Sequence, residues 1–459
     1  MTPDPDPDAG PDAVCLDVGS TWTKAALVRA DGALAGYAAH RTTGPDLLTG
    51  VDAAVRAVLA AAPMAAEPPL LACSSAGGGL RLAVVGTERL AAEEAGYRVA
   101  RTAGSRVVHV HGGPLDPGDV RVLRGHRPGG VLLTGGADGD DPAPLLHNAA
   151  RLARARVRFP IVLAGNAAAR DDALALLTAT GRTVVACANV APRRGELVPG
   201  PARAAIAGLY AGQVVGGRGP SVAPRFRRLV RAGTPDAVGT GAGVLADLLG
   251  VRVLVVDVGC ATTDVHFALP APSAPGAAPP PSGAPGPRRT AEGDLGMRAA
   301  AGGVLVEGQA EGVVDPVEAD LLGPAVQRMT TDVGYVPRDA GGAAEDRRIA
   351  ALAAVLALRR HWTEPDGGAD EEVGGGTDGG AGPPDVGLLV LTGGVFRRPD
   401  SGGLAALVAT LQADTVLAPL LEKARVAVDT DFTVVPAGLL TAAGRHEAAR
   451  ALLHDHLLG

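Results

Sequence analysis

Short apolar runs alternate along the chain with Ala- and Leu-rich stretches of helical spacing. Each run ends in Gly or Asn, as in VCLDVG (14–19), VLLTGG (131–136), FPIVLAGN (159–166) and VGLLVLTGG (386–394). Apolar runs of this length bounded by turn residues are typical of buried strands, with helices packed on the sheet faces. The pattern predicts an α/β protein whose clearest helices lie near residues 145–155, 168–180 and 344–360.

Three segments break this alternation. Residues 1–12 alternate Asp and Pro and have nothing apolar to bury, which predicts a disordered leader. Residues 270–289 and 364–384 are rich in Pro, Gly, Ala and Asp, and we expect both to form surface loops of low complexity. Long surface loops cost little extra entropy, so these segments need not mark domain boundaries.

Composition restricts the class of protein. Of 459 residues, 47% are hydrophobic and 20% charged, as in a globular protein, and with 2% aromatics the core must be filled by Ala, Val and Leu. The net charge of -7 and the scattered arginines argue against a nucleic-acid partner. No apolar stretch approaches the ~18 residues of a membrane span, and the acidic start is unlike a secretion signal. We therefore expect a cytoplasmic protein with no membrane partner.

The cysteines support the same compartment. Cys15, Cys73, Cys187 and Cys260 are far apart in the sequence and form no C-x-x-C pair. Neither a disulfide framework nor a zinc site is indicated, so we expect reduced thiols.

One motif occurs twice. VCLDVGSTWTK (14–24) and LVVDVGCATTD (254–264) each follow an apolar run, and from the first Asp onward they share Asp, Val, Gly and a later Thr. The repeat predicts a duplicated hairpin. The alternative is coincidence, in which each D-V-G is only a strand that ends in a glycine turn.

The paired motifs fit a polyphosphate. Gly19 and Gly259 allow tight turns whose backbone N–H groups face an anion, because no β-carbon blocks its approach. Hydroxyls and one lysine add donors and positive charge, from Ser20, Thr21, Thr262, Thr263 and Lys24. Asp17 and Asp257 supply carboxylates for Mg²⁺, which is usually held by one or two carboxylates, phosphate oxygens and water.

A third segment follows the second hairpin. Gly393 and Gly394 end a buried strand, where the backbone can lie flat against a purine and ribose. The order of the three segments resembles the nucleotide site of the actin, sugar kinase and heat-shock chaperone ATPase superfamily. The resemblance implies two ribonuclease H-like α/β lobes around a nucleotide cleft. We place the first lobe at residues 13–245, with additional α/β material at about 100–235, and the second at 246–459.

Further blocks occur in the order seen in one family. They resemble the glutamate mutase accessory proteins, the MutL-type family, through SSAGGGLRLAVVG (74–86), LLTGGADGD (132–140), LLHNAARLA (145–153), VLAGN (162–166), ANVAPR (188–193), DVGCATTDVH (257–266) and TAEGDLGMR (290–298). The resemblance implies an ATP- and Mg²⁺-binding accessory or reactivating protein for an adenosylcobalamin-dependent glutamate (methylaspartate) mutase. The mutase subunits would be its partners, and cobalamin would be involved only through them.

For this function we expect a slow ATPase with Asp17, Asp257 and Asp264 as catalytic residues. Two alternatives stay open at this point. One is a small-molecule kinase or ATP-dependent hydrolase of the same superfamily, and the other is a nucleotide-binding scaffold that does not hydrolyse ATP.

Several motifs have a functional and a structural interpretation. The LLTGGADGD loop is a second nucleotide site, a ligand or partner contact, or a structural turn. Glu292 and Asp294 position a hydrolytic water, or they begin a helix. Asn148 and Asn166 contact a ligand, or they cap helices and turns. Asp264 and His266 form a D-x-H pattern, but Leu269 stands where cobalt-binding domains need Gly, so we expect His266 simply to lie in a strand.

Overall fold

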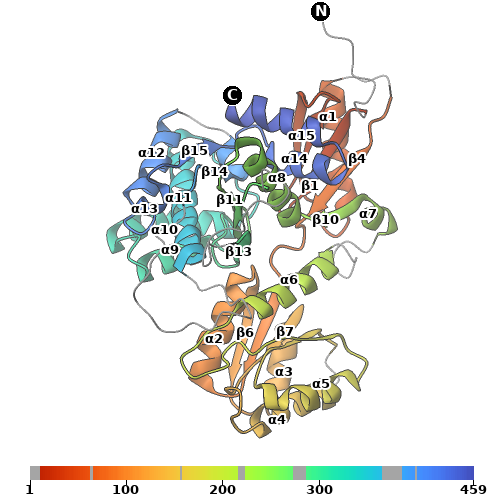
Figure 1. The fold of residues 1–459 in the computed structure, drawn as a ribbon, viewed down its shortest axis with the longest axis vertical. Coiled ribbons are helices and arrows are strands. Elements are labelled where there is room, and N and C mark those ends of the chain that lie inside the picture. The colour runs from red at the N-terminus through yellow and green to blue at the C-terminus, as the bar shows by residue number, and fades with distance from the viewer. Residues whose placement is uncertain are drawn as a thin grey trace, which may run out of the picture.

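Three five-stranded sheets organise the chain (Figure 1). The computed structural model describes residues 11–62, 66–155, 158–214, 223–271, 286–363, 385–397 and 401–459. The expected leader, apart from residues 11 and 12, therefore lies outside the described residues. So do all of the expected loop 364–384 and residues 272–285 of the other loop.

Two of the sheets share one topology. The first has the order β10-β4-β1-β2-β3 and contains β1 (Ala13–Val18), β2 (Trp22–Val28), β3 (Leu34–Arg41), β4 (Leu70–Ser74) and β10 (Val230–Gly233). The second has the order β15-β14-β11-β12-β13 and contains β11 (Val253–Val258), β12 (Thr263–Ala268), β13 (Arg288–Glu292), β14 (Leu388–Thr392) and β15 (Arg425–Val428). In each, three antiparallel strands are followed by two parallel ones. The expected pair of related ribonuclease H-like lobes is confirmed.

The third sheet is wholly parallel, with the order β6-β5-β7-β8-β9. Its strands are β5 (Arg81–Gly86), β6 (Arg106–Gly112), β7 (Gly130–Leu133), β8 (Ile161–Leu163) and β9 (Val184–Ala186). The chain leaves the first sheet after β4 and returns to it at β10, so we call residues 81–214 the insert. Its sheet begins well before residue 100, and β10 belongs to the first lobe rather than to the insert.

Helices cover the faces of the insert's sheet. They are α2 (Arg89–Thr102), α3 (Pro117–Gly125), α4 (Ala143–Arg154), the 3₁₀ turn η1 (Ala167–Ala169), α5 (Arg170–Thr178) and α6 (Gly200–Val214). The helices expected near 145–155 and 168–180 are α4 and α5. In Figure 1 the insert lies below the two lobes, with α6 on the side that faces them.

The lobes meet at a close helix crossing. Helix α8 (Thr234–Leu249) follows β10, and its counterpart α14 (Val434–Ala442) follows β15. A β-carbon at Gly241 would lie 2.3 Å from the carbonyl oxygen of Val434, and one at Gly438 would lie 1.9 Å from that of Ala237. Glycine is required at both positions because the two backbones touch. The first lobe also carries α1 (Leu47–Ala61) and α7 (Pro224–Leu229). Helix α15 (His446–Leu453), followed by a π-helical turn to Leu458, packs on both α14 and α8.

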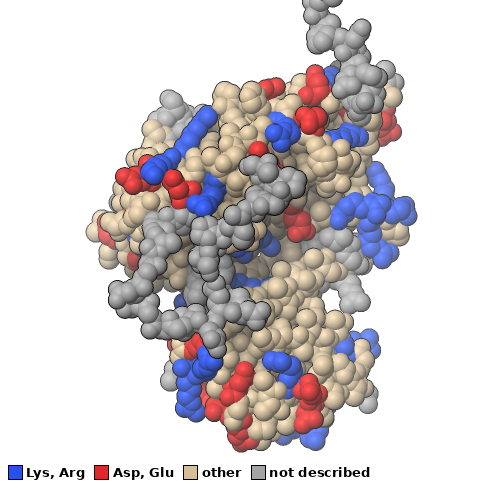
Figure 2. Space-filling view, viewed as in Figure 1, with Lys and Arg blue, Asp and Glu red and all other residues tan. Residues whose placement is uncertain are grey.

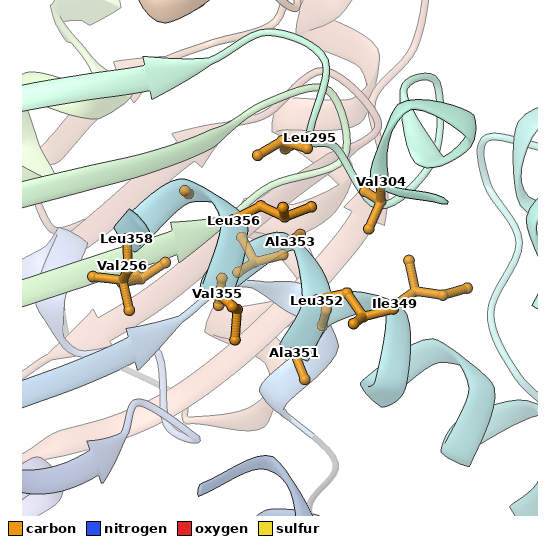
Figure 3. Packing of buried hydrophobic residues seen from close by; sticks show 14 of the residues in the cluster. Val256, Leu295, Val304, Ile349, Ala351, Leu352, Ala353, Val355, Leu356 and Leu358 are labelled. Atoms are coloured by element: carbon orange, nitrogen blue, oxygen red, sulfur yellow. The ribbon is translucent and has the colours of Figure 1, made fainter. Parts of the chain in front are cut away.

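The core of the second lobe surrounds α11 (Ala340–Thr363), the helix expected at 344–360. All residues from Ile349 to Leu358 are buried, as expected for a helix that is apolar on every side. Figure 3 shows Leu352 and Leu356 of this helix packed among residues of the sheet and its loops. The surrounding helices are α9 (Ala301–Ala310), α10 (Pro316–Thr331), the 3₁₀ turn η2 (Gly394–Arg397), α12 (Ser401–Ala413) and α13 (Ala418–Leu421). Among the described helices, none is long and apolar enough to cross a membrane.

Candidate nucleotide cleft

The two copies of the repeated motif form hairpins of the same geometry. Asp17 pairs across the first hairpin with Lys24, and Asp257 pairs across the second with Asp264. The turn of each closes with a glycine N–H that donates to a carbonyl oxygen three residues later, at 3.0 Å for Gly19 and 2.9 Å for Gly259.

Both turns require glycine. A β-carbon would lie 2.7 Å from the Trp22 oxygen at position 19 and 2.8 Å from the Thr262 oxygen at position 259. Real β-carbons do not approach an oxygen so closely, so a side chain would force either turn open. The matching turns support duplication over coincidence.

The two turns converge on one space. A β-carbon at Gly78 would lie 4.0 Å from the β-carbon of Ser20 and 3.6 Å from that of Ala261, so the hairpins approach the same point from two sides. They line a single cavity of about 450 Å³, a size usual for small-molecule sites. Figure 2 shows the surface hollowed between the lobes and the insert, with basic side chains visible in the hollow.

Ten of the twelve residues predicted for the site line this cavity: Asp17, Gly19, Ser20, Thr21, Lys24, Asp257, Gly259, Thr262, Asp264 and Gly394. Thr263 does not, because its buried hydroxyl donates to the carbonyl oxygen of Leu295. Gly393 does not line it either. Its φ of +132° and the 2.3 Å between a β-carbon there and the Val258 oxygen show that glycine is needed where β14 ends against β11.

Charge in the first hairpin is neutralised internally. Lys24 Nζ lies 2.8 Å from Asp17 Oδ2, and the Thr234 hydroxyl donates to Asp17 Oδ1 at 2.6 Å. Burial alone would lower the pKa of Lys24, but the carboxylates of Asp17 and Asp257 raise it above its usual value. Lys24 is therefore a permanent cation in the cleft wall.

The second hairpin places two acids opposite one another. Asp264 accepts from Thr262 Oγ1 at 2.9 Å and from Arg289 Nε at 2.9 Å. The side chain of Asp257 has no hydrogen-bond partner among the described residues. Burial, opposed by Lys24 and reinforced by Asp264 and Asp17, raises the pKa of Asp257 to about 7.

The donor set fits Mg²⁺ bound together with phosphate. Within the described ranges, no three acidic, His or Cys side chains gather closely enough to hold a metal ion on their own. Magnesium commonly takes only one or two carboxylates and fills its other positions with phosphate oxygens and water. Asp257 offers the open carboxylate, whereas both oxygens of Asp17 already accept hydrogen bonds.

Sequence reasoning missed much of the cleft. Arg298 forms a buried two-bond ion pair with Asp346, at 2.8 and 3.1 Å, and also donates to the Tyr335 carbonyl oxygen. The Arg397 guanidinium lies 3.4 Å from the centre of the Tyr37 ring. These residues line the same cavity as the hairpins but come from distant segments. Arg298 ends the TAEGDLGMR block, but the block itself does not indicate that this residue reaches the cleft. Tyr210 of the insert, Arg289 and Arg347 are further lining residues that were missed.

Neither interpretation of the TAEGDLGMR acids is correct. Glu292 and Asp294 do not line the cleft, and the next helix, α9, begins only at Ala301. Both carboxylates instead bind Arg360, at 2.9 and 3.1 Å. Burial is the main cause that raises the pKa of Glu292 to about 7, against the opposing charge of Arg360.

The side chains of the other motifs have contacts within the protein. The Asn166 side chain caps a turn by accepting from the Ala168 N–H, as expected. Asn148 caps neither a helix nor a turn: it lies inside α4, and its amide bonds to the backbones of Leu115, Gly86 and Gly113. In the LLTGGADGD loop, Asp138 accepts from the Asn189 side chain at 2.9 Å. His266 lies buried in β12, where desolvation lowers its pKa to about 3. The four cysteines are free thiols.

The fold and the cleft define the class: a two-lobed ribonuclease H-like protein with twin glycine turns at an interlobe cavity. The chain belongs to the family described as MutL protein, whose model matches residues 13–457. It is 35% identical over 294 residues to "Protein MutL" of Clostridium tetanomorphum. That match covers 62% of this chain and 63% of the relative, so it spans less than two thirds of the relative's length.

Solved structures resemble the whole chain only distantly. Component A of (R)-2-hydroxyglutaryl-CoA dehydratase from Acidaminococcus fermentans is 9% identical, with a TM-score of 0.27 over 96% of this chain and 97% of that one. The ethanolamine utilization protein EutJ from Carboxydothermus hydrogenoformans is 11% identical, with a TM-score of 0.29 over 97% and 91%. Scores this low support no functional statement, and the fold assignment rests on the sheet topology described above.

Proposed function

We propose that this chain binds Mg-ATP in the cleft and acts as an accessory or reactivating protein for an adenosylcobalamin-dependent glutamate (methylaspartate) mutase. Membership of the MutL family supports the client enzyme. The observation that carries the nucleotide assignment is the convergence of two matching glycine turns on one cavity. Cobalamin enters this function only through the mutase subunits.

The lining of the cavity offers contacts for both parts of a nucleotide. The turns at Gly19 and Gly259, with Lys24, would hold the phosphates between the hairpins. The base and ribose would lie along Gly394, the position to which the sequence assigns adenosine and which also lines the cavity. Five cations and four carboxylates line the cavity, which suits a polyanion that arrives with a divalent cation.

Hydrolysis in such a site depends on positioning and charge. Phosphoryl transfer asks little covalent chemistry of a protein, and Mg²⁺ when bound would neutralise charge on the terminal phosphates. We assign Asp257 to the metal, because its carboxylate accepts no hydrogen bond among the described residues, and Mg²⁺ when bound would lower the pKa of about 7 that burial gives it. Asp17 would act through metal-bound water, and Asp264 would hold the turn through Thr262.

Binding would act as a switch if the lobes close on ATP, because a ligand shifts a conformational equilibrium through its different affinity for the two states. The crossing at Gly241 and Gly438 is a suitable pivot, since contacts there are backbone to backbone. The free thiols are typical of a reducing compartment, and we place the protein in the cytoplasm.

The test is to incubate the protein with inactivated glutamate mutase, Mg-ATP and fresh adenosylcobalamin, and to measure recovered mutase activity. Recovery that needs ATP, and that Asp17→Ala reduces, supports the proposal. Phosphorylation of a metabolite without recovery would identify a kinase instead. Tight ATP binding without turnover or recovery would identify a scaffold.

A further inference from the structure

The insert is fastened to the second lobe, although it is an insertion in the first. Ala103 at the end of α2 forms a parallel β-bridge with Ala291 at the end of β13. The Gly104 N–H donates to the Ala291 oxygen at 2.7 Å, and the Gly293 N–H donates to the Arg101 oxygen at 3.1 Å. The insert is therefore bound by backbone hydrogen bonds to the edge strand of the second lobe's sheet.

Close packing and charge strengthen this contact. A β-carbon at Gly293 would lie 2.2 Å from the backbone oxygen of Ser105, so only glycine lets the two backbones meet. Arg101 of the insert lies 2.8 Å from Glu307 and 3.4 Å from Asp294. Asp294 of the TAEGDLGMR segment thus has a structural partner in the insert.

The other half of the same segment supports the second phosphate turn. The Met297 N–H donates to the Gly259 oxygen and the Arg298 N–H to the Cys260 oxygen, both at 2.9 Å. A β-carbon at Gly296 would lie 2.8 Å from that Cys260 oxygen. Six residues of chain, 293 to 298, therefore connect the docked insert to the turn.

The insert also reaches the cleft directly. Ala207 and Tyr210 are one turn apart on α6, and both line the cavity together with Asp17, Asp264 and Arg289. Burial, reinforced by the charge of Asp264, raises the pKa of Tyr210 above its usual value. Its hydroxyl therefore stays protonated and can donate a hydrogen bond to an anion.

We propose that the insert forms the third wall of the nucleotide site, with Tyr210 as a positioning residue for the terminal phosphate, and that docking at Gly293 holds this wall in place. The inference rests on the proposed nucleotide function. It adds that the two lobes alone do not complete the site. The insert closes the part of the cavity that would face the terminal phosphate.

Tyr210→Phe removes only the hydroxyl and is the first test. We expect ATP turnover to fall about tenfold, as for the loss of one hydrogen bond to a charged group. ADP affinity should stay within about twofold, because ADP lacks the terminal phosphate, and each tenfold step corresponds to about 1.4 kcal/mol. Tyr97→Phe, in the insert but outside the cavity, is the matched control and should leave turnover and both affinities unchanged.

Gly293→Val tests the docking, with Gly302→Val as its control because a β-carbon at residue 302 meets no atom within 4 Å. Hydrogen exchange at residues 101–105 should become faster in Gly293→Val alone. ATP turnover in Gly293→Val should fall about as much as in Tyr210→Phe. A variant that combines both substitutions should lose no more turnover than either single variant, because both remove the same wall of the site.

The outcomes separate the two proposals. If the natural protein does not bind ATP, the proposed function is wrong, and so is this inference, which rests on it. If it binds and hydrolyses ATP but Tyr210→Phe turns over at the natural rate, or lowers ADP and ATP affinity equally, only the inference is overturned. Faster exchange at 101–105 in Gly293→Val with unchanged turnover would also overturn it. A Gly293→Val protein that fails to fold leaves the decision to Tyr210→Phe.

Discussion

The two hairpins have the same backbone and opposite electrostatics. Across the first, Asp17 faces Lys24 at 2.8 Å, and across the second, Asp257 faces another acid, Asp264. Arg289 neutralises Asp264 from the next strand, which leaves Asp257 without a partner among the described residues. The two copies of the motif thus share the glycine turn but differ in the residue that pairs with the first Asp, which is Lys24 in one and Asp264 in the other.

This difference indicates a division of roles. A neutralised acid beside a lysine suits the binding of phosphate, whereas a carboxylate with a pKa near 7 suits a metal ion or a proton. Substitution of the turn glycine should therefore weaken nucleotide binding equally in both hairpins. Substitution of the first Asp of the motif should have different effects in the two.

Blocking a turn has the largest expected effect. Gly259→Val and Gly19→Val each place a side chain against a carbonyl oxygen less than 3 Å away, and we expect each to weaken Mg-ATP binding by more than about 100-fold, near the upper end of overpacking costs. Calorimetric titration with Mg-ATP measures this. Gly323→Val, where a β-carbon meets no atom within 4 Å, should bind normally. Normal binding by one of the two turn variants would remove that hairpin from the site.

Removing the acids should separate the hairpins. Asp257→Asn should weaken Mg-ATP binding about tenfold at pH 8, through loss of a charged ligand. In the natural protein the affinity should fall as the pH drops below about 7, where Asp257 takes up a proton, and in Asp257→Asn this dependence should disappear. Titration calorimetry at pH 6, 7 and 8 measures both effects. A natural protein and a variant with parallel pH profiles would show that Asp257 is not the titrating group.

The same substitution should stabilise the protein without nucleotide. Between the ordinary Asp pKa of 3.8 and about 7, the folded state holds a proton on Asp257 that the unfolded state lacks. The free energy of unfolding therefore falls as the pH rises through this window. Asn cannot ionise, so Asp257→Asn should melt at a higher temperature than the natural protein at pH 8, and the gain should shrink towards pH 5.

The hairpins could be predicted because their signals are local and repeated. Strand, turn and acid lie within eleven residues, and the duplication supports each copy through the other. The order of the segments also predicted the pair of lobes. Tyr210 and Arg289 could not be found this way, because their place in the cleft depends on packing between segments far apart in sequence. Arg298 does lie in the TAEGDLGMR block, but that block alone did not predict its place in the cleft.

The sequence also could not show which residues of the second hairpin point into the cleft and which point into the interior. Successive residues of a strand point to opposite faces, and the letters Thr-Thr-Asp do not say which of them faces the cleft. Asp264 faces the cleft, so its neighbour Thr263 faces the interior. The Thr shared by both copies, Thr23 and Thr263, is fully buried in each, so duplication preserved a structural residue there.

The variant with the smallest expected effect on nucleotide binding tests the assignment of Thr263 as a structural residue. Thr263→Val removes a buried donor to the Leu295 carbonyl and should lower the free energy of unfolding by about 1 kcal/mol. Its Mg-ATP affinity should equal that of the natural protein, because the side chain lies outside the cavity. Thr262→Val, one residue earlier, removes a hydroxyl that lines the cavity and bonds to Asp264, so it should weaken binding instead. Denaturant unfolding and calorimetry on the two variants measure both quantities. Weaker nucleotide binding by Thr263→Val with unchanged stability would place that hydroxyl in the phosphate site after all.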